Sequence, residues 1–438
     1  MVVGEFTQDA DVLVIGGGPA GYSCAFHAAT LGRQVTLVDA RESLGGRCLQ
    51  ENCIPTKTML HDLTDGPHQA DDMRTHITDV VGTLERGLDA RAKAGGIEIL
   101  TGTARFLNNR EVQVAGTHVS RIRFKRAVIC IGGQPESLAV EQEGPPLITA
   151  AGIAEAPHAI QGRVLIVGHG PEAIESAAMA ATLGESACLL TRGSPLLPDV
   201  PEALTRRFVR QLDCDIDTNQ LDSIGITDAQ WTATCGEQIH HGDVLINAAP
   251  MKANNDALDL AAAGVKMDDA GNIVTDAKCT TSEPRILAAG MCTGRPHYAG
   301  GAMAQGRVAA EVMCGQPAAY EPAAIPTLVF GRTQLAWSGE VTPSNAAERI
   351  MPWGASGLAV AMGDDRGCTM LRWDVESGTI IGAGAVGQCA TELADAFTMA
   401  IELGATLRDL ADMVCAHPTR SELLIEAARQ ALQANTSP

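Results

Sequence analysis

The chain has 438 residues, too many for one ordinary hydrophobic core, so two or three domains are expected. Its formal net charge of −20 argues against nucleic acid as a partner, because an acidic surface repels phosphates. No apolar run reaches the roughly 18–20 residues needed to cross a membrane, and the start lacks a basic stretch followed by an apolar one, so neither a membrane span nor a secretory leader is expected. Thirteen cysteines, mostly scattered singly, favour a cytoplasmic protein with reduced thiols over a secreted disulfide scaffold.

Residues 11–40 predict a buried strand, a glycine-rich turn, a helix and a second strand. In the turn, Gly16 permits a tight bend, Gly18 lets a pyrophosphate approach the backbone, and Gly21 lets the helix pack on the strand. The phosphate would lie at the helix N-terminus, where free N–H groups favour anions. Asp39 ends the second strand, where a carboxylate should bind ribose hydroxyls. This placement favours a dinucleotide-binding unit over an ordinary glycine-rich turn.

Two cysteines follow within GGRCLQENCIPTK, residues 45–57. A zinc site needs four ligands, and no second Cys/His pair of suitable spacing lies nearby in the sequence. A regular helix would separate Cys48 and Cys53 by about 7.5 Å, beyond the ~7 Å limit for a disulfide, so we expect a distortion around Leu49–Asn52 and a helix from near Pro55. Cys53 would then lie just before a helix N-terminus, which stabilises a thiolate. Redox exchange is favoured over a structural disulfide, and two unrelated core cysteines remain the alternative.

Residues 162–192 repeat the strand–turn–helix–strand plan of residues 11–40. Two such units about 150 residues apart strongly indicate two dinucleotide-binding domains. Apolar strands at Arg126–Pro135 and Arg285–Met291 are predicted to finish these domains.

The last part of the chain has a different order of predicted strands and helices. Strands are predicted at Cys368–Val375 and Thr379–Val386, followed by helices at Thr391–Leu403 and Leu407–Val414. This order of elements indicates an α+β module, which we expect to form an interface.

The cysteine segment, placed directly after the first glycine-rich unit, resembles the active site of the flavin-dependent pyridine nucleotide–disulfide oxidoreductases. PAGYSCAFHAATLG and CIPTK resemble the dihydrolipoamide dehydrogenase branch of that family. The resemblance extends over nearly the whole chain, through TGTARF, LDLAAAGVKMDDAGNIVTD, QGRVAAEVM, LAWSGE and AIELGATLRDLADMVCAHPTRSE. It implies an α/β fold with two Rossmann-like dinucleotide-binding domains, for FAD and for NAD or NADP, and a C-terminal α+β dimerisation domain.

The same resemblance implies four segments. The FAD-binding domain would span residues 1–145 and return over 269–322. The NAD(P)-binding domain would span 146–268, and the dimerisation domain 323–438.

The resemblance also implies roles for individual residues. Cys48 would be the thiol that exchanges with substrate, Cys53 the thiolate that faces the flavin, and Lys57 a neighbour of flavin N5. The FAD-binding positions implied are Gly16, Gly18, Pro19, Ala20, Gly21, Asp39, Gly46, Arg47, Lys57, Ala104, Gly132, Met291 and Ala299. No metal is expected.

The C-terminal HPTRSE supplies an acid/base group. A dithiol must lose a proton before it attacks a disulfide, and an imidazole has a suitable pKa. The resemblance assigns His417 to this step and Glu422 to its orientation, with the pair reaching the cysteines of the partner subunit. The alternative is that Thr419 to Glu422 form a capping box and Glu422 only caps a helix.

The second glycine-rich turn departs from the family pattern. The NAD(P) positions implied are Gly168, Gly170, Ala173, Glu175 and Arg192, and Glu175 is expected to pair with Lys57. Ala173 replaces the third glycine, and Thr191 with Arg192 replaces the usual carboxylate after the strand. Both changes resemble the pattern found in family members that use NADPH.

Two further positions depart from the family. The family has G-R-x-P-N after the strand, and this chain has Ala249-Pro250-Met251-Lys252-Ala253 at that place. The family also has a Gly-Asp whose carboxylate contacts FAD, and this chain has Gly290-Met291 instead. The leading interpretation is a homodimeric, dihydrolipoamide dehydrogenase-like enzyme acting on a lipoyl-bearing protein or a small dithiol. The alternatives are an NADPH-dependent disulfide reductase of the glutathione reductase type and a flavoprotein electron carrier with a decayed nicotinamide site.

Overall fold

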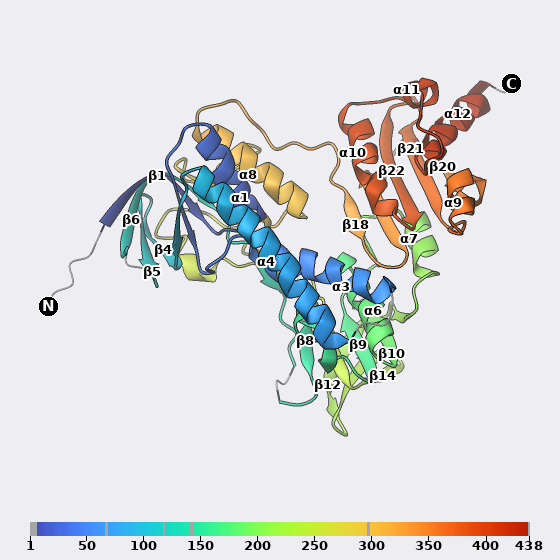
Figure 1. Ribbon diagram of the computed structural model, residues 1–438, viewed down its shortest axis with the longest axis horizontal. Coiled ribbons are helices and arrows are strands. Elements are labelled where there is room, and N and C mark those ends of the chain that lie inside the picture. Colours follow the sequence, from blue (N-terminus) through green and yellow to red (C-terminus); the bar gives the residue numbers. More distant parts are fainter. Residues whose placement is uncertain (1–6, 66–68, 117–118, 141–142, 296–297, 437–438) are drawn as a thin grey trace.

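The computed structural model describes residues 7–65, 69–116, 119–140, 143–295 and 298–436 (Figure 1). The outer ends of the first and last predicted domains therefore lie outside the described residues, as does part of the N-terminal stretch on which the expectation of no secretory leader rests. Among the described residues, no helix is both long enough and apolar enough to cross a membrane.

The first glycine-rich unit lies in a seven-stranded sheet, ordered β3-β2-β1-β6-β5-β4, with β17 also paired to β6. Strands β1, β2, β3, β6 and β17 are parallel neighbours, and β4 and β5 form an antiparallel hairpin beside β6. The bounds are β1 Thr7–Ile15, β2 Val35–Asp39, β3 Glu98–Thr101, β4 Thr103–Asn108, β5 Glu111–Ala115, β6 Arg121–Ile129 and β17 Ile286–Ala288. Because β17 comes from far along the chain, the predicted return of the chain to the first sheet is confirmed.

Helices α1 (Pro19–Thr30) and α8 (Ala299–Met313) pack closely beside this sheet (Figure 1). A Cβ at Gly306 of α8 would lie 2.2 Å from the Ala20 carbonyl oxygen, so only glycine permits the approach. Between the cysteine segment and β3, the chain forms α3 (Cys53–Asp65) and the 25-residue α4 (Ala70–Ala94).

The second glycine-rich unit lies in a five-stranded parallel sheet, ordered β11-β10-β9-β15-β8. A three-stranded antiparallel sheet, β12-β13-β14, belongs to the same domain, and β7 pairs with β16 in a separate two-stranded ladder. The bounds are β7 Gly133–Pro135, β8 Leu147–Thr149, α5 Gly152–Glu155, η1 Pro157–Ala159, β9 Arg163–Val167, α6 Pro171–Leu183, β10 Ser186–Leu190, α7 Glu202–Val209, β11 Asp215–Asp217, β12 Leu221–Thr227, β13 Gln230–Cys235, β14 Gln238–Gly242, β15 Val244–Asn247, β16 Met251–Ala253 and η2 Asp256–Leu258.

The C-terminal domain is a five-stranded antiparallel sheet, ordered β18-β19-β22-β21-β20, covered by helices. This confirms the predicted α+β module. The remaining bounds are α2 Gly46–Gln50, η3 Met291–Thr293, β18 Thr327–Val329, β19 Gln334–Gly339, β20 Ala346–Pro352, η4 Trp353–Ala355, α9 Gly357–Ala361, β21 Cys368–Asp374, β22 Ile380–Gly387, η5 Ala390–Leu393, α10 Ala394–Glu402, α11 Leu407–Asp412 and α12 Glu422–Thr436.

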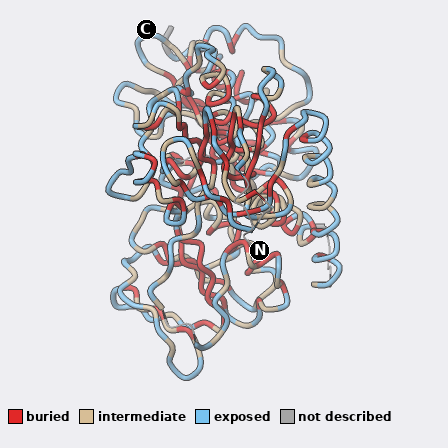
Figure 2. The backbone as a smooth tube through the Cα atoms, turned by 90° about the vertical axis from the view of Figure 1, so that its left-hand side faces the viewer, coloured by how far each residue is buried: buried red, intermediate tan, exposed pale blue. Residues whose placement is uncertain are grey.

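One apolar core joins parts of all three domains. It contains Met59 of α3, Ile174 of α6 and Trp337 of β19, which are all buried in a single cluster. Buried residues follow the sheets, and exposed residues lie on the loops and outer helices (Figure 2). Because side chains from three domains share this core, the site built between α3 and α6 has a fixed geometry.

Sequence periodicity placed the elements correctly but misjudged some ends. The strand expected over Arg126–Pro135 is the end of β6, which stops at Ile129, followed by the separate β7. The helix expected over Thr391–Leu403 begins with the 3₁₀ turn η5 before α10. Apolar runs show burial, whereas the exact ends depend on hydrogen bonds that the pattern does not reveal.

The glycine turn after β1 generates the first prediction. A Cβ at Gly21 would lie 1.7 Å from the Gly16 carbonyl oxygen, so Gly21→Ala should lower the free energy of unfolding by about 1–3 kcal/mol or more. Gly87, in the exposed part of α4, has no atom within 4 Å of its added Cβ, so Gly87→Ala should raise that free energy by about 0.5–1 kcal/mol. Urea unfolding of both variants measures the difference, and equal stability would contradict the packing argument.

Candidate active site

Cys48 and Cys53 lie on either side of a helix break. Cys48 is in α2, which ends at Gln50, and Cys53 is the first residue of α3. The Asn52 N–H donates to the Arg47 carbonyl oxygen at 2.8 Å, which closes the bend between the helices. The predicted distortion is confirmed. The expected start near Pro55 is wrong, because α3 begins two residues earlier, and Pro55 fits within the first turn, where its missing N–H needs no partner.

The two cysteines are half-buried thiols in contact, and their pKa values are shifted in opposite directions. The hydrogen bond from Cys48 lowers the pKa of Cys53, and Lys57 lowers it further, against burial and the charges of Glu172 and Glu175. The same hydrogen bond, together with burial, raises the pKa of Cys48. The pair therefore stabilises a thiolate at Cys53 and a protonated thiol at Cys48, at the start of a helix, where a negative charge is favoured.

Lys57 and Glu175 form an ion pair between α3 and α6, with Nζ and Oε2 2.7 Å apart. Glu175 is 2% exposed, and its other oxygen, Oε1, accepts from the Phe330 N–H at 3.1 Å. Burial raises the pKa of Glu175, and Lys57 opposes that rise. The Lys57 ammonium also lies 5.1 Å from the centre of the Phe330 ring. The expected Lys57–Glu175 pairing is therefore present.

Phe330 was missed by the sequence analysis. It lies in the turn between β18 and β19 of the C-terminal sheet. An aromatic residue before a glycine gives no distinctive sequence signal, so only the structure reveals its contact with the ion pair.

The turn after β1 is shaped to receive a phosphate. Gly18 caps α1 without a side-chain hydrogen bond, Pro19 and Ala20 begin the helix, and no acidic residue lies in the first turn. A Cβ added at Gly18 would meet only the Gly46 Cα, at 3.9 Å, so this side of the turn is open. Free N–H groups at an uncapped helix start suit the pyrophosphate of FAD.

Gly46 brings the cysteine segment against this turn. Its φ is +56°, and an added Cβ would lie 2.7 Å from the Gly18 Cα, so any larger residue would push the two segments apart. Asp39 lies beside them and accepts from the Gly17 N–H and, at 2.7 Å, from the Arg41 N–H. Its carboxylate thus stabilises the turn itself, and the expected contact with ribose stays a prediction.

Arg47 has guanidinium nitrogens that fit an anion. Its Nε and Nη2 are buried without hydrogen-bond partners, and Nη2 lies 3.6 Å from Glu172, outside hydrogen-bond range. Buried unpaired donors are rare because they cost free energy. Together with the open glycine turn, these donors show that the residues present fit a phosphate-bearing cofactor.

The remaining expected FAD positions lie on four different segments. Ala104 is buried in β4, Gly132 lies in the bend after β6 with a φ of +72°, and Ala299 is the first residue of α8. Met291 begins the 3₁₀ turn η3, and its side chain contacts Gly133, where an added Cβ would lie 2.6 Å from the Met291 Cγ. The Met291 side chain therefore packs against β7.

The second glycine turn is closely packed at Gly168 and open at Gly170. A Cβ at Gly168 would lie 2.2 Å from the Ala248 carbonyl oxygen and 2.8 Å from the Ala173 Cβ, whereas a Cβ at Gly170 would meet nothing. Two polar atoms here, His169 Nδ1 and Thr191 Oγ1, are buried without hydrogen-bond partners. They fit a polar ligand at the start of α6.

Arg192 follows this strand in a left-handed conformation, with a φ of +61°. Its Nη1 lies 3.2 Å from Glu136 Oε2. The arginine expected to recognise a second phosphate is therefore already paired with a carboxylate.

Glu172 is a second residue that the sequence analysis did not single out. It lies in the first turn of α6, and its Oε1 accepts from Asn52 Nδ2 at 2.5 Å. Glu172 also faces Arg47 and raises the pKa of Cys53. It links the second glycine turn directly to the segment between the two cysteines.

His417 and Glu422 are hydrogen-bonded at the start of α12, with Nδ1 and Oε1 2.7 Å apart. Glu422 Oε2 accepts from the Thr419 N–H at 2.8 Å, and hydrogen bonds to His417 and Thr419 lower the pKa of Glu422. Glu422 therefore both caps the helix and contacts the imidazole, one oxygen for each. The two interpretations of this carboxylate are compatible.

The His417 side chain is 78% exposed, and α12 lies at the outer end of the C-terminal domain, away from α3 (Figure 1). His417 and the cysteines of one chain therefore do not form one site within that chain.

Comparison with known proteins agrees with this architecture. The profile of the pyridine nucleotide-disulphide oxidoreductases matches residues 10–306, and the profile of their dimerisation domain matches residues 325–428. The dihydrolipoyl dehydrogenase of Bacillus subtilis is 30% identical over 99% of this chain and 98% of its own, and that of Halobacterium salinarum is 31% identical with the same coverage.

Solved structures share the fold at lower identity. The HOCl-induced flavoprotein disulfide reductase RclA of Escherichia coli superposes with a TM-score of 0.87 at 22% identity, covering 96% of this chain and 99% of its own. LpdA of Mycobacterium tuberculosis gives 0.86 at 21%, covering 96% and 100%. The relatives use FAD and NAD(P), and the dimerisation domain indicates a homodimer. The chain therefore belongs to the pyridine nucleotide-disulphide oxidoreductase family.

Proposed function

We propose that this flavoprotein oxidoreductase acts as a homodimer that oxidises dihydrolipoyl thiols through a Cys48–Cys53 disulfide and delivers the electrons to FAD and then NAD(P)+. The main support is the thiol pair itself, in which Cys48 favours the protonated form and Cys53 the thiolate beside Lys57. The dihydrolipoyl dehydrogenases that match almost the full chain support this substrate class. The mostly single, reduced cysteines agree with a cytoplasmic location.

The thiol chemistry follows from these residues. His417 of the partner subunit takes a proton from one substrate thiol, and the resulting thiolate attacks Cys48 Sγ of the disulfide. The S–S bond breaks, and Cys53 leaves as a thiolate that Lys57 stabilises. The second substrate thiol then loses its proton and displaces Cys48, so the substrate forms its own disulfide. Two electrons and two protons leave the substrate.

The phosphates of the cofactor would lie at the uncapped start of α1, near Arg47. FAD, when bound, supplies an acceptor for the electron pair and a hydride donor for nicotinamide. Arg47 would hold its phosphates, and the Lys57–Glu175 pair would present a positive charge beside Cys53. Glu422 holds His417 by Nδ1, so Nε2 is the nitrogen left to take the substrate proton.

Specific observations favour the two alternatives. Ala173 and Arg192 favour an NADPH-dependent disulfide reductase of the glutathione reductase type, although Arg192 is paired with Glu136. Glu172 at the start of α6 places a carboxylate where nicotinamide phosphates would bind, which favours an electron carrier with a decayed nicotinamide site.

Replacing Cys48 should raise the pKa of Cys53, because the hydrogen bond from Cys48 is the largest cause that lowers it. In the reduced Cys48→Ala protein, the midpoint of Cys53 alkylation against pH should therefore move to higher pH. Cys48→Ser keeps a hydroxyl donor, so its shift should be smaller. Iodoacetamide rates resolved by peptide mass spectrometry measure both, and equal midpoints in the two variants would contradict the proposed hydrogen bond.

His417→Gln should lower dihydrolipoamide oxidation by about 10²–10⁴-fold, because the base that deprotonates the substrate is lost. Flavin content and thermal stability should stay normal, since the Thr419–Glu422 contact remains. Steady-state rates provide the measurement, and reduction of a one-electron dye by the pre-reduced flavin provides the control. Full dihydrolipoamide activity in His417→Gln would contradict the acid/base role of His417. Glu422 would then serve only to cap the helix.

Anaerobic titration of the purified holoprotein distinguishes the three functions. Dihydrolipoamide should reduce the flavin, and NAD+ or NADP+ should reoxidise it. Flavin that is reduced by NADPH and reoxidised by glutathione disulfide, but is not reduced by dihydrolipoamide, would favour the reductase. Flavin that is reduced by dihydrolipoamide but is reoxidised by neither nicotinamide would favour the carrier.

A further inference from the structure

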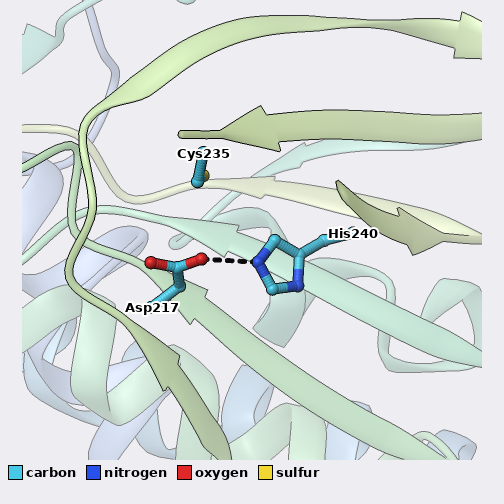
Figure 3. A group of neighbouring side chains, drawn as sticks. All are labelled: Asp217, Cys235 and His240. Atoms are coloured by element: carbon cyan, nitrogen blue, oxygen red, sulfur yellow. Dashed lines mark hydrogen bonds and ion pairs between the residues drawn. The ribbon is translucent and has the colours of Figure 1, made fainter. Parts of the chain in front are cut away.

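A thiol, a carboxylate and an imidazole gather in the second domain, apart from the cysteine pair (Figure 3). Asp217 ends β11, Cys235 ends β13 and His240 lies on β14. One ligand atom from each residue lies within 4.8 Å of the others. The Asp217 side chain is 4% exposed, Cys235 is buried, and the His240 side chain is 21% exposed. The imidazole is therefore the most exposed side chain of the cluster.

The cluster joins two sheets. Strand β11 belongs to the parallel sheet, whereas β13 and β14 form a hairpin of the antiparallel sheet. His240 pairs with Ala233, and Cys235 is two residues further along the same strand, so both side chains point to one face. That face looks onto the end of β11 (Figure 3).

The imidazole is fixed on both sides. Its Nε2 lies 2.6 Å from Asp217 Oδ2, and its Nδ1 lies 3.7 Å from the Sγ of Cys188 on β10. The other Asp217 oxygen accepts from the Asn219 N–H at 2.8 Å. A histidine that binds a metal through one nitrogen commonly has its other nitrogen held in this way.

The surroundings favour a cation. Among the described residues, no lysine or arginine forms an ion pair with Asp217.

A divalent cation at this cluster would bind the Cys235 sulfur as a thiolate and release the thiol proton.

We propose that Asp217, Cys235 and His240 bind a zinc ion, with Cys188 holding the imidazole in position. The mixture of sulfur, nitrogen and oxygen ligands suits zinc better than calcium or magnesium, which prefer oxygen alone. Binding would replace the Cys235 thiol proton, which leaves to solvent, and water would complete the coordination. This site is an exception to the expectation, drawn from the sequence, that the protein binds no metal.

The ion would need a small local rearrangement. With bonds of ~2.0–2.1 Å, a tetrahedral zinc ion holds two ligand atoms about 3.3 Å apart. The Asp217 and His240 atoms, now 2.6 Å apart, would therefore separate slightly as the ion replaces their shared hydrogen. The partial exposure of His240 gives the imidazole room to move.

The site adjoins the second glycine-rich unit. The Thr191 N–H donates to the Asp217 carbonyl oxygen at 3.0 Å, and Arg192 follows directly. A bound ion would fix the end of β11 and, through this hydrogen bond, the segment after β10.

Metal titration of the full holoprotein tests the proposal. Cys48→Ser/Cys53→Ser serves as the parent in every arm, because vicinal thiols also bind metals. Co²⁺ should produce a thiolate-to-cobalt absorption band with one equivalent bound, and Zn²⁺ should displace it. Cys235→Ser should abolish the band, and His240→Gln should weaken binding at least tenfold. Cys188→Ala should weaken it by about 10–100-fold, as the loss of an outer hydrogen-bond partner does.

Cys214→Ser is the matched control. Cys214 is a half-buried thiol near Cys188, outside the proposed ligand set, so its loss should leave binding unchanged. Unchanged cobalt binding in Cys235→Ser and His240→Gln, or equal loss in Cys214→Ser, would overturn the proposal. If Cys235→Ser fails to fold, judged by flavin content, then His240→Gln at the more exposed position decides alone.

Discussion

The close approach of Gly46 to Gly18 is the constraint on which the active site depends. The cysteine segment can lie against the first glycine turn because Gly46 has no side chain: an added Cβ there would lie 2.7 Å from the Gly18 Cα. This contact fixes Cys48 and Cys53 next to the helix start that fits a cofactor phosphate. The helix break after Gln50 then lets the two sulfur atoms meet although four residues separate them in the sequence.

A chain of charged groups extends from this contact into the second domain. Lys57 stabilises the Cys53 thiolate and is itself held by the buried Glu175. A carboxylate in this environment resists ionisation, and the ammonium at 2.7 Å compensates for that cost. The Phe330 N–H donates to the Glu175 carboxylate. All three domains therefore supply a residue to the ion pair beside the cysteines or to its hydrogen bonds.

Most of the architecture could be predicted from the sequence. Two strand–turn–helix–strand units with glycines at the required positions predict two dinucleotide-binding domains, because few other folds need that pattern. The Lys57–Glu175 and His417–Glu422 pairings were expected from the family resemblance and are present. The start of α3 was placed two residues late, because proline is compatible with several positions in a first turn.

Other features could not be predicted because they depend on contacts between distant segments. Phe330 contacts Glu175 across 155 positions of sequence, and Glu172 contacts Asn52 across 120. Phe330 belongs to no recognisable motif, and Glu172 occupies a position that the glycine pattern of the second turn does not specify. The same holds for the cluster of Asp217, Cys235 and His240, whose members have no metal-binding spacing and meet only when two sheets pack together.

Glu172 couples the second glycine turn to the charge of Cys53. Its carboxylate lies in the first turn of α6 and opposes ionisation of Cys53. An anionic ligand that moved Glu172 would therefore change the proton affinity of Cys53. Reciprocity of binding free energies requires that protonation of Cys53 would change the affinity for that ligand by the same factor. A proton at the thiol and an anion at the second glycine turn would thus bind as a coupled pair.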